Sequence, residues 1–244
     1  MTAVTPKVAL VTGGSRGIGA ATAVGLAERG IDVAITYRDK KARAEKVAAK
    51  LESLGRRAHL VRADLTSEQD MTAAINEVEE KFGQIDFLIL NASGGLEKGK
   101  AADYAIRLNR DAQVMTAELA LPLMPVDGRI VFVTSHLAHF YGEKPVFPHY
   151  EPVAKSKRAG EDALRERSEE FDERGISLVV VSGDLIEGTI TPKLLERTSP
   201  GLIETRREQA GTLPSVADFS KEIVNAALSS TLKSGETVYV GQVE

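Results

Sequence analysis

The sequence predicts an α/β protein built on one doubly wound, parallel β-sheet of about seven strands with helices on both faces. Short apolar segments alternate with longer segments of helical periodicity along all 244 residues. Strands that are apolar on both sides are typical of a parallel sheet covered by helices. A glycine-rich turn joins the first apolar segment to the first helical one. With 43% hydrophobic residues, these features indicate a single domain over residues 1–244.

In the first half of the chain, the helices have readable boundaries. The alanine-rich helix after the glycine turn stops at Gly30, and Thr66 or Ser67 caps a later helix. Glu68 lies in the first turn of that helix, where the dipole favours an anion. We expect strands at residues 7–12, 32–37, 57–62 and 86–90, and helices at 17–29, 40–54 and 66–82.

The second half continues the same alternation. Pro152 suits the first turn of a long helix. A segment of Ile, Ser, Leu and Val after it has the composition of a buried strand. We expect strands at residues 129–134, 176–182 and 237–240, and helices at 101–121, 152–174 and 216–228.

Composition excludes several classes of protein. The net charge of −4 leaves no basic surplus to hold nucleic acid, and no apolar run approaches the length of a membrane span. Residues 1–6 lack the apolar core of a secretory signal and are interpreted as a short tail. Without cysteine, disulfides and thiolate chemistry are excluded, and the cytoplasm is the expected location. The expected partner is a small-molecule substrate, not a nucleic acid or a membrane.

The glycine-rich turn predicts a dinucleotide site, because it follows a strand and opens a helix. Gly13 permits the tight turn, Gly17 lets the backbone approach a pyrophosphate, and Gly19 lets the helix pack on the sheet. Unpaired N–H groups at the helix start favour phosphates. The expected contacts of the turn with the cofactor come from Gly13, Ser15, Arg16, Gly17, Ile18 and Gly19.

The end of the second strand indicates which dinucleotide is bound. Arg38 follows that strand, and together with Arg16 it could clamp a 2′-phosphate. An acidic residue would instead bind the ribose hydroxyls of NAD, and Asp39 is the candidate, although it lies further into the loop. We therefore expect NADP(H) as the preferred cofactor, with NAD(H) as the alternative.

These motifs resemble the short-chain dehydrogenase/reductase family, which has a Rossmann fold, and the resemblance covers nearly the whole chain. The family's Thr-Gly-x-x-x-Gly-x-Gly motif is present from Thr12 to Gly19. The resemblance implies further cofactor contacts in three places. They are Asp64 and Leu65 after the third strand, Asn91, Ala92 and Ser93 after the fourth, and Gly183 after the sixth.

The resemblance also implies a catalytic set. Ser135 would orient a substrate carbonyl, and a tyrosine hydroxyl would donate the proton as hydride leaves the nicotinamide. Lys157 would bind the nicotinamide ribose and lower the pKa of the tyrosine. Asn109 would support Lys157 through a water. The family also suggests a homo-oligomer, a dimer or a tetramer, formed through the helices at 101–121 and 152–174.

The spacing departs from the family's Tyr-x-x-x-Lys pattern, because the residue four positions before Lys157 is Val153. Tyr150 lies three residues earlier, and we expect it to be the proton donor with Lys157. A pairing with Lys155 and a purely packing role for Tyr150 are the alternatives. His136 or His149 could replace the missing acid. His136, His139 and His149 carry no further metal-ligand motif, so no metal site is expected.

The exit from the sixth strand also departs from the family, since Asp184 follows Gly183 and Thr189 comes late. Asp184 and Glu187 would either select a cationic or polyhydroxylated substrate or cap the next helix, and we favour the cap. Residues 184–212 are expected to cover the substrate. We interpret the sequence as that of an oxidoreductase that transfers a hydride between NADP(H) and a carbonyl or alcohol. The alternative is a dinucleotide-binding protein with little or no turnover, a sensor or an oligomer partner.

Overall fold

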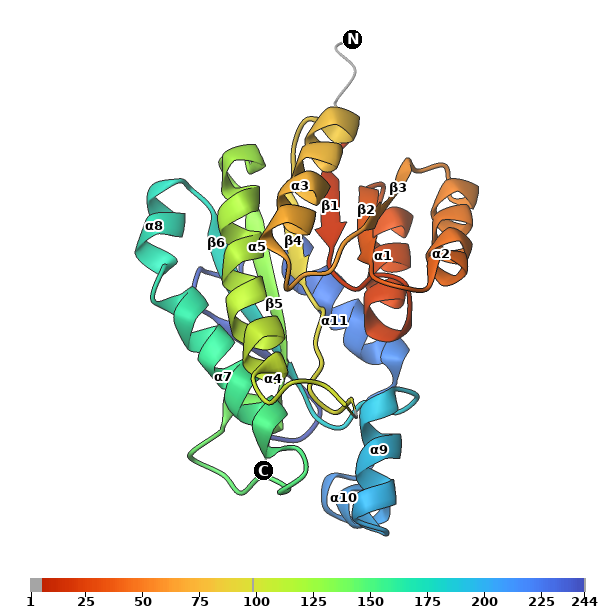
Figure 1. The fold of residues 1–244 in the computed structure, drawn as a ribbon, viewed down its shortest axis with the longest axis vertical. Helices are drawn as coiled ribbons and strands as arrows, with labels where there is room; N and C mark the ends of the chain where they lie inside the picture. Colours follow the sequence, from red (N-terminus) through yellow and green to blue (C-terminus); the bar gives the residue numbers. More distant parts are fainter. Residues whose placement is uncertain (1–5, 98, 244) are drawn as a thin grey trace.

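The computed structural model describes residues 6–97 and 99–243 (Figure 1). Residues 1–5 of the expected tail, residue 98 and residue 244 lie outside the described residues. One seven-stranded sheet has the order β3-β2-β1-β4-β5-β6-β7, and every neighbouring pair is parallel. The strands are β1 (Val8–Val11), β2 (Asp32–Tyr37), β3 (Ala58–Arg62), β4 (Phe87–Leu90), β5 (Arg129–Ser135), β6 (Ser177–Gly183) and β7 (Thr237–Val240).

Helices cover both faces of this sheet (Figure 1). The larger ones are α1 (Gly17–Glu28), α2 (Lys41–Ser53), α3 (Glu68–Phe82), α5 (Ala112–Ala120), α7 (Glu151–Arg165) and α11 (Val216–Leu228). The others are α4 (Tyr104–Ile106), the π-helical turn η1 (Arg107–Asp111), the 3₁₀ turn η2 (Leu121–Leu123), α6 (His136–His139), α8 (Ser168–Glu173), α9 (Ile190–Thr198) and α10 (Leu202–Ala210).

The alternation of side chains along the strands builds two cores. In β1, Val8 and Leu10 belong to the core under α3, α5 and α7, whereas Ala9 and Val11 belong to the core under α1, α2 and α11. Successive strand residues point to opposite faces, so a strand buried on both sides must be apolar throughout. The predicted fold class, a doubly wound parallel sheet, is confirmed.

Two helices begin at a residue whose side chain caps the helix. Ser67 caps α3, since its hydroxyl accepts a hydrogen bond from the backbone N–H of Asp70, and Gly83 ends the helix with a left-handed backbone. Ser215 and Asp218 form a reciprocal capping box at the start of α11. Of the two residues expected to cap α3, the structure uses Ser67.

Three expected segments differ from the structure. The single helix expected at 152–174 is two helices, α7 and α8, which meet at Arg167, where Glu118 of α5 and Glu170 hold the guanidinium. The helix expected at 101–121 begins at Tyr104 and is interrupted by η1. Residues 184–212, without a readable pattern, contain α9 and α10, which pack on a third apolar cluster with Tyr150 and Val153.

The reversal of strand order between β1 and β4 positions the functional site. In such sheets, the crevice at the carboxyl ends of the strands on either side of the reversal is where a ligand binds. The turns after β1, β4, β5 and β6 meet there, and α9 and α10 lie below them in Figure 1. Among the described residues, no helix is both long and apolar enough to cross a bilayer.

Candidate active site

A cavity of about 1340 Å³ opens at this edge of the sheet. Its walls come from segments far apart in the sequence, so the fold brings together what the motifs predict separately. All the expected cofactor contacts line it, namely Gly13, Ser15, Arg16, Gly17, Ile18, Gly19, Arg38, Asp64, Leu65, Asn91, Ala92, Ser93, Lys157 and Gly183. Of the expected catalytic residues, Ser135, Tyr150 and Lys157 line the same cavity.

The glycine turn has the backbone that its sequence predicts. Gly13 and Gly17 have φ values of 65° and 54°, a region that residues with a side chain rarely adopt. A Cβ on Gly19 would lie 2.6 Å from the carbonyl oxygen of Gly13, so the start of α1 requires glycine. A Cβ on Gly17 would meet no protein atom within 4 Å, which leaves that backbone open to the cavity.

Thr12 joins the turn after β1 to the segment after β4. Its hydroxyl accepts hydrogen bonds from the backbone N–H groups of Asn91 and Ala92, at 3.0 and 3.1 Å. The Asn91 side chain donates to the Thr12 carbonyl at 2.9 Å. Asn91 and Ala92 are thereby fixed across from the glycine turn. Thr12 is the first residue of the glycine motif, but this role of its hydroxyl was not predicted.

A cationic region lies beyond the ends of β2 and β3. Arg38 donates hydrogen bonds to Asp39 at 3.0 Å and to the Tyr104 hydroxyl at 2.8 Å. The bond to Asp39 is the main cause that raises the pKa of Arg38. Burial alone would raise the pKa of Asp64, but two hydrogen bonds from Thr66 hold it below its usual value. Asp39, the candidate ligand of the ribose, thus forms an ion pair with Arg38. Tyr104 lines the cavity, and the motifs did not predict it.

Ser135 and Tyr150 meet at the other end of the cavity. Ser135 ends β5 and Tyr150 immediately precedes α7, and their hydroxyl oxygens lie 3.1 Å apart. Tyr150 is 5% exposed, and burial raises the pKa of its hydroxyl, while the bond to Ser135 opposes that shift. Val153 faces Gly95 instead, since a Cβ on Gly95 would come within 3.1 Å of it.

Lys157 is the buried cation of this region, with 8% of its surface exposed. Burial lowers the pKa of Lys157 to about 8, and the charge of Glu161 opposes that shift. Lys155, the alternative partner of Tyr150, is exposed. The structure therefore brings Tyr150, Ser135 and Lys157, rather than Lys155, to one cavity.

Asn109 makes no direct hydrogen bond to Lys157 but contacts residues next to it. Its side-chain amide donates to the Gly94 carbonyl at 2.8 Å and to the Ser156 hydroxyl at 2.9 Å. Its backbone carbonyl faces Gly160 of α7, where a Cβ would lie only 2.0 Å away. Asn109 in the π-helical turn thus packs against α7 on both sides of Lys157.

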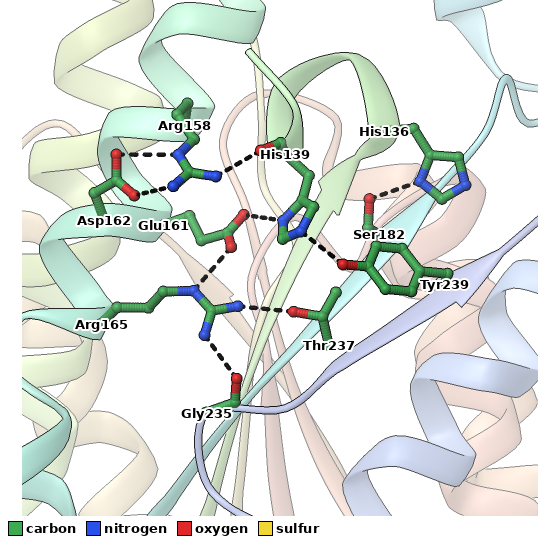
Figure 2. Close-up of polar contacts among 10 residues, drawn as sticks. All are labelled: His136, His139, Arg158, Glu161, Asp162, Arg165, Ser182, Gly235, Thr237 and Tyr239. Carbon is green, nitrogen blue, oxygen red and sulfur yellow. Dashed lines mark hydrogen bonds and ion pairs between the residues drawn. The ribbon is translucent and has the colours of Figure 1, made fainter. Parts of the chain in front are cut away.

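The histidines near the site have different surroundings. His136 accepts or donates a hydrogen bond at 2.8 Å with Ser182, and burial lowers its pKa to about 4, which keeps the ring neutral. His139 bonds Glu161 and the Tyr239 hydroxyl, each at 2.9 Å (Figure 2). His149 is exposed. A neutral His136 lacks the imidazolium proton that a substitute acid would donate at neutral pH.

Asp184 and Glu187 do not cap the next helix, which corrects the expectation for them. Thr189 precedes α9 without a side-chain cap. Both carboxylates bind α10 instead. Arg206 holds both oxygens of Asp184 at 2.9 to 3.1 Å, and Arg207 pairs with Glu187 at 2.7 Å. The acidic side chains therefore fix the segment that borders the cavity, which sequence alone did not predict because their partners lie about 20 residues away.

Comparison with known proteins shows the family of this chain. The sequence model of the short chain dehydrogenase family matches residues 7–198. The chain is 33% identical over 187 residues to 1-cyclohexenylcarbonyl-CoA reductase of Streptomyces collinus, covering 74% of this chain and 65% of that enzyme. It is 32% identical over 203 residues to hydroxynaphthalene reductase Arp2 of Aspergillus fumigatus, covering 80% of this chain and 72% of that one.

A similar solved structure is a short chain dehydrogenase from Burkholderia cenocepacia in complex with NADP. It is 28% identical, has a TM-score of 0.83, and the match covers 97% of this chain and 96% of that one. Because the family match extends over most of the chain, this protein belongs to the short-chain dehydrogenase/reductase family, as the motifs predicted.

Proposed function

We propose that this protein is an NADP(H)-dependent oxidoreductase that interconverts a carbonyl group and an alcohol. The observation that carries the proposal is the contact of 3.1 Å between the hydroxyls of Ser135 and Tyr150, in a cavity that also holds Lys157 and the glycine turn. A proton donor and a group that can hold a carbonyl oxygen thus share one space with a dinucleotide-binding motif.

In the proposed mechanism, Ser135 holds and polarises the substrate oxygen, and Tyr150 donates the proton to it. The cofactor, when bound, supplies the hydride. Lys157 binds the nicotinamide ribose, and its positive charge makes the phenol a stronger acid. Asn109 is a positioning residue, which keeps α7 in place through Ser156. In the oxidative direction, the same groups act in reverse, with Tyr150 accepting the proton.

The proposal includes a preference for NADP(H) over NAD(H). Arg38 and Arg16 line the cavity, and guanidinium groups suit the geometry of a phosphate. Asp39 is engaged by Arg38, which weakens its candidacy as a ligand of the ribose hydroxyls. The NADP complex of the Burkholderia relative is consistent with this preference.

We also propose a homo-oligomer, a dimer or a tetramer, in which α5 and α7 contribute to the contact between copies. The family resemblance supports it, and light scattering with size-exclusion chromatography tests it. A monomer over the whole concentration range used for activity measurements would contradict it.

The test of the function is a reductase assay that follows loss of NADPH with a panel of cyclic and aromatic ketones, chosen because one relative is named a hydroxynaphthalene reductase. The proposal expects turnover with at least one ketone and its loss in Tyr150→Phe. Tight NADPH binding with no turnover across the panel would instead support the alternative, a dinucleotide-binding protein without family chemistry.

A further inference from the structure

Strand β7 is followed by residues 241–243, which we call the strap and which reach the cavity. Val240, the last residue of β7, accepts a hydrogen bond from the backbone N–H of Asp184 at 2.9 Å. Gly241 then turns the chain with a φ of 91°, a region that favours glycine. A Cβ on Gly241 would lie 2.8 Å from Cβ of Asp184 and 2.9 Å from Cγ of Pro214. The path of the strap is therefore fixed where it leaves the sheet.

Two cationic side chains hold the strap by its backbone. Nη2 of Arg206 on α10 donates to the Gln242 carbonyl at 2.9 Å, and Nζ of Lys144 donates to the Val243 carbonyl. Hydrogen bonds from charged donors are stronger than those between neutral groups. Lys144 lies between α6 and α7, and Figure 1 shows the end of β7's following segment beside that loop. The strap thus joins α10 to the segment that leads from Ser135 to Tyr150.

Val243 is the strap residue that lines the cavity, and its side chain is half-buried. Gln242 is exposed and does not line the cavity. The residues that the strap contacts belong to the segments after β5 and β6, and they are Lys144, Asp184, Arg206 and Pro214. The dinucleotide site is formed instead by the turns after β1 to β4. Val243 therefore borders the substrate side of the cavity.

The wall on this side is mainly apolar. Nζ of Lys144 lies 4.6 Å from the centre of the Phe140 ring, so its charge is engaged by the ring and by the Val243 carbonyl. The same segments contribute further apolar residues to the cavity, namely Leu137, Phe147, Leu185 and Ile186. Such a wall suits a substrate with an apolar ring system, and a rigid residue at its end would limit the length of that ring system.

We propose that Val243 is a specificity-determining residue, which forms the end wall of the substrate pocket and limits the length of an apolar, cyclic ketone. The inference rests on the proposed function for the reaction, whereas the position of Val243 can be measured without turnover. Lys144 and Arg206 are positioning residues, because they hold Val243 through the backbone of the strap. Both bonds end on carbonyl groups, so the side chains of the strap can be exchanged without removing either bond.

The test compares two ketones that share the reactive ring found in the reductase assay, one of them extended by a phenyl group opposite the carbonyl. Val243→Ala should raise the ratio of kcat/KM for the long ketone to that for the short one by about tenfold, and Val243→Phe should lower it, because a change of one methylene in a pocket alters specificity by about 10- to 200-fold. Gln242→Ala is the matched control, since it changes an exposed side chain and keeps the carbonyl. An equal ratio in wild type and both Val243 variants would overturn the inference.

The role of the strap is tested at Lys144. Lys144→Met removes the donor to the Val243 carbonyl and keeps an apolar side chain over Phe140, so the ratio should move in the same direction as in Val243→Ala. Lys193→Met is the control, because it also removes a lysine that lines the cavity, on α9 rather than beside the strap. A ratio that changes equally in both lysine variants, or in neither, would contradict the positioning role of Lys144.

A fluorescence measurement locates residue 243 without activity. The chain has no tryptophan, so Val243→Trp introduces a single indole. Its emission should be quenched by acrylamide less than that of Gln242→Trp, and adding Lys144→Met should increase the quenching. Equal quenching at positions 242 and 243 would overturn the placement of Val243 in the wall. A shielded indole in a protein that reduces no ketone would contradict the proposed function and retain the wall.

Discussion

The hydroxyl of Tyr150 lies 3.1 Å from that of Ser135, although Tyr150 is seven residues before Lys157 and Val153 stands at the usual distance of four. Tyr150 reaches the cavity from the entrance of α7, while Val153 lies beside Gly95 and does not line the cavity. A tyrosine at the helix entrance can therefore reach the hydroxyl of Ser135 without the usual spacing of four residues from Lys157.

Replacing the proposed acid tests the arrangement first. Tyr150→Phe removes one oxygen and preserves the ring that packs with Val153 and Leu185. We expect turnover to fall by about 10²- to 10⁴-fold, the typical contribution of general acid catalysis. NADPH affinity, measured by fluorescence titration, should be unchanged. Tyr141→Phe is the control, since its hydroxyl contacts Glu151 outside the site. Equal turnover in Tyr150→Phe and wild type would remove Tyr150 from the mechanism.

The cofactor preference depends on Arg38. In Arg38→Leu, the dissociation constant for NADPH should rise by about 10- to 100-fold, because charge-assisted hydrogen bonds contribute about 1.5–3 kcal/mol. The constant for NADH should change little, since NADH lacks the 2′-phosphate. Arg56→Leu is the control, because that guanidinium contacts the Gly30 carbonyl at an exposed position. A parallel loss of affinity for both cofactors would contradict the assignment.

The contact between α7 and the π-helical turn leaves no room at Gly160. A Cβ there would lie 2.0 Å from the carbonyl oxygen of Asn109. Gly160→Ala should destabilise the protein by about 1–3 kcal/mol, as expected for overpacking. Thermal unfolding should show this as a Tm lower by several degrees, while Ala163→Ser on the same helix should not. An unchanged Tm for Gly160→Ala would show that the two segments can separate without cost.

The ion pair between Asp184 and Arg206 fixes α10 over the cavity. The Asp184 side chain is 6% exposed, and leaving it without its cation costs about 3–5 kcal/mol in comparable buried pairs. Arg206→Gln should therefore open residues 190–212 to proteolysis and raise the KM for substrate. Arg207→Gln should have a much smaller effect, because Glu187 is 40% exposed and screened by water. Equal protease sensitivity in the two variants would contradict this account.

The pH dependence follows from Lys157. Burial lowers its pKa to about 8, so the ammonium is present below that pH and is lost as the pH rises through it. The value of kcat/KM for NADPH should accordingly decline with a midpoint near 8 in the free enzyme. A lysine in water would give a decline well above this range. A profile that stays flat to pH 10 or so would mean that the charge of Lys157 is not required.

Much of the fold and of the cofactor site is predictable from sequence because the signals are local. The run from Val11 to Gly19 contains a strand end, a turn and a helix start, and the structure has all of them. The apolar strands are likewise recognisable from their own residues, without knowledge of the strands with which they pair.

What could not be predicted depends on residues far apart in the chain. The pairs Asp184 with Arg206 and His139 with Glu161 join positions 22 residues apart in each case. The break between α7 and α8 has no proline or glycine to mark it, and Glu118 of α5 holds it. That Tyr150 and not Val153 lies beside Ser135 likewise depends on where the segment after β5 places the start of α7. Long-range contacts of this kind leave no periodic pattern in the sequence.

A crystal structure with NADP⁺ bound would test the role of Tyr150 through one distance. We expect the Tyr150 hydroxyl to lie about 4–5 Å from C4 of the nicotinamide, with Lys157 on the ribose, which leaves room for a carbonyl between them. A Tyr150 side chain turned out of the cavity, with Val153 facing the nicotinamide ring, would contradict it.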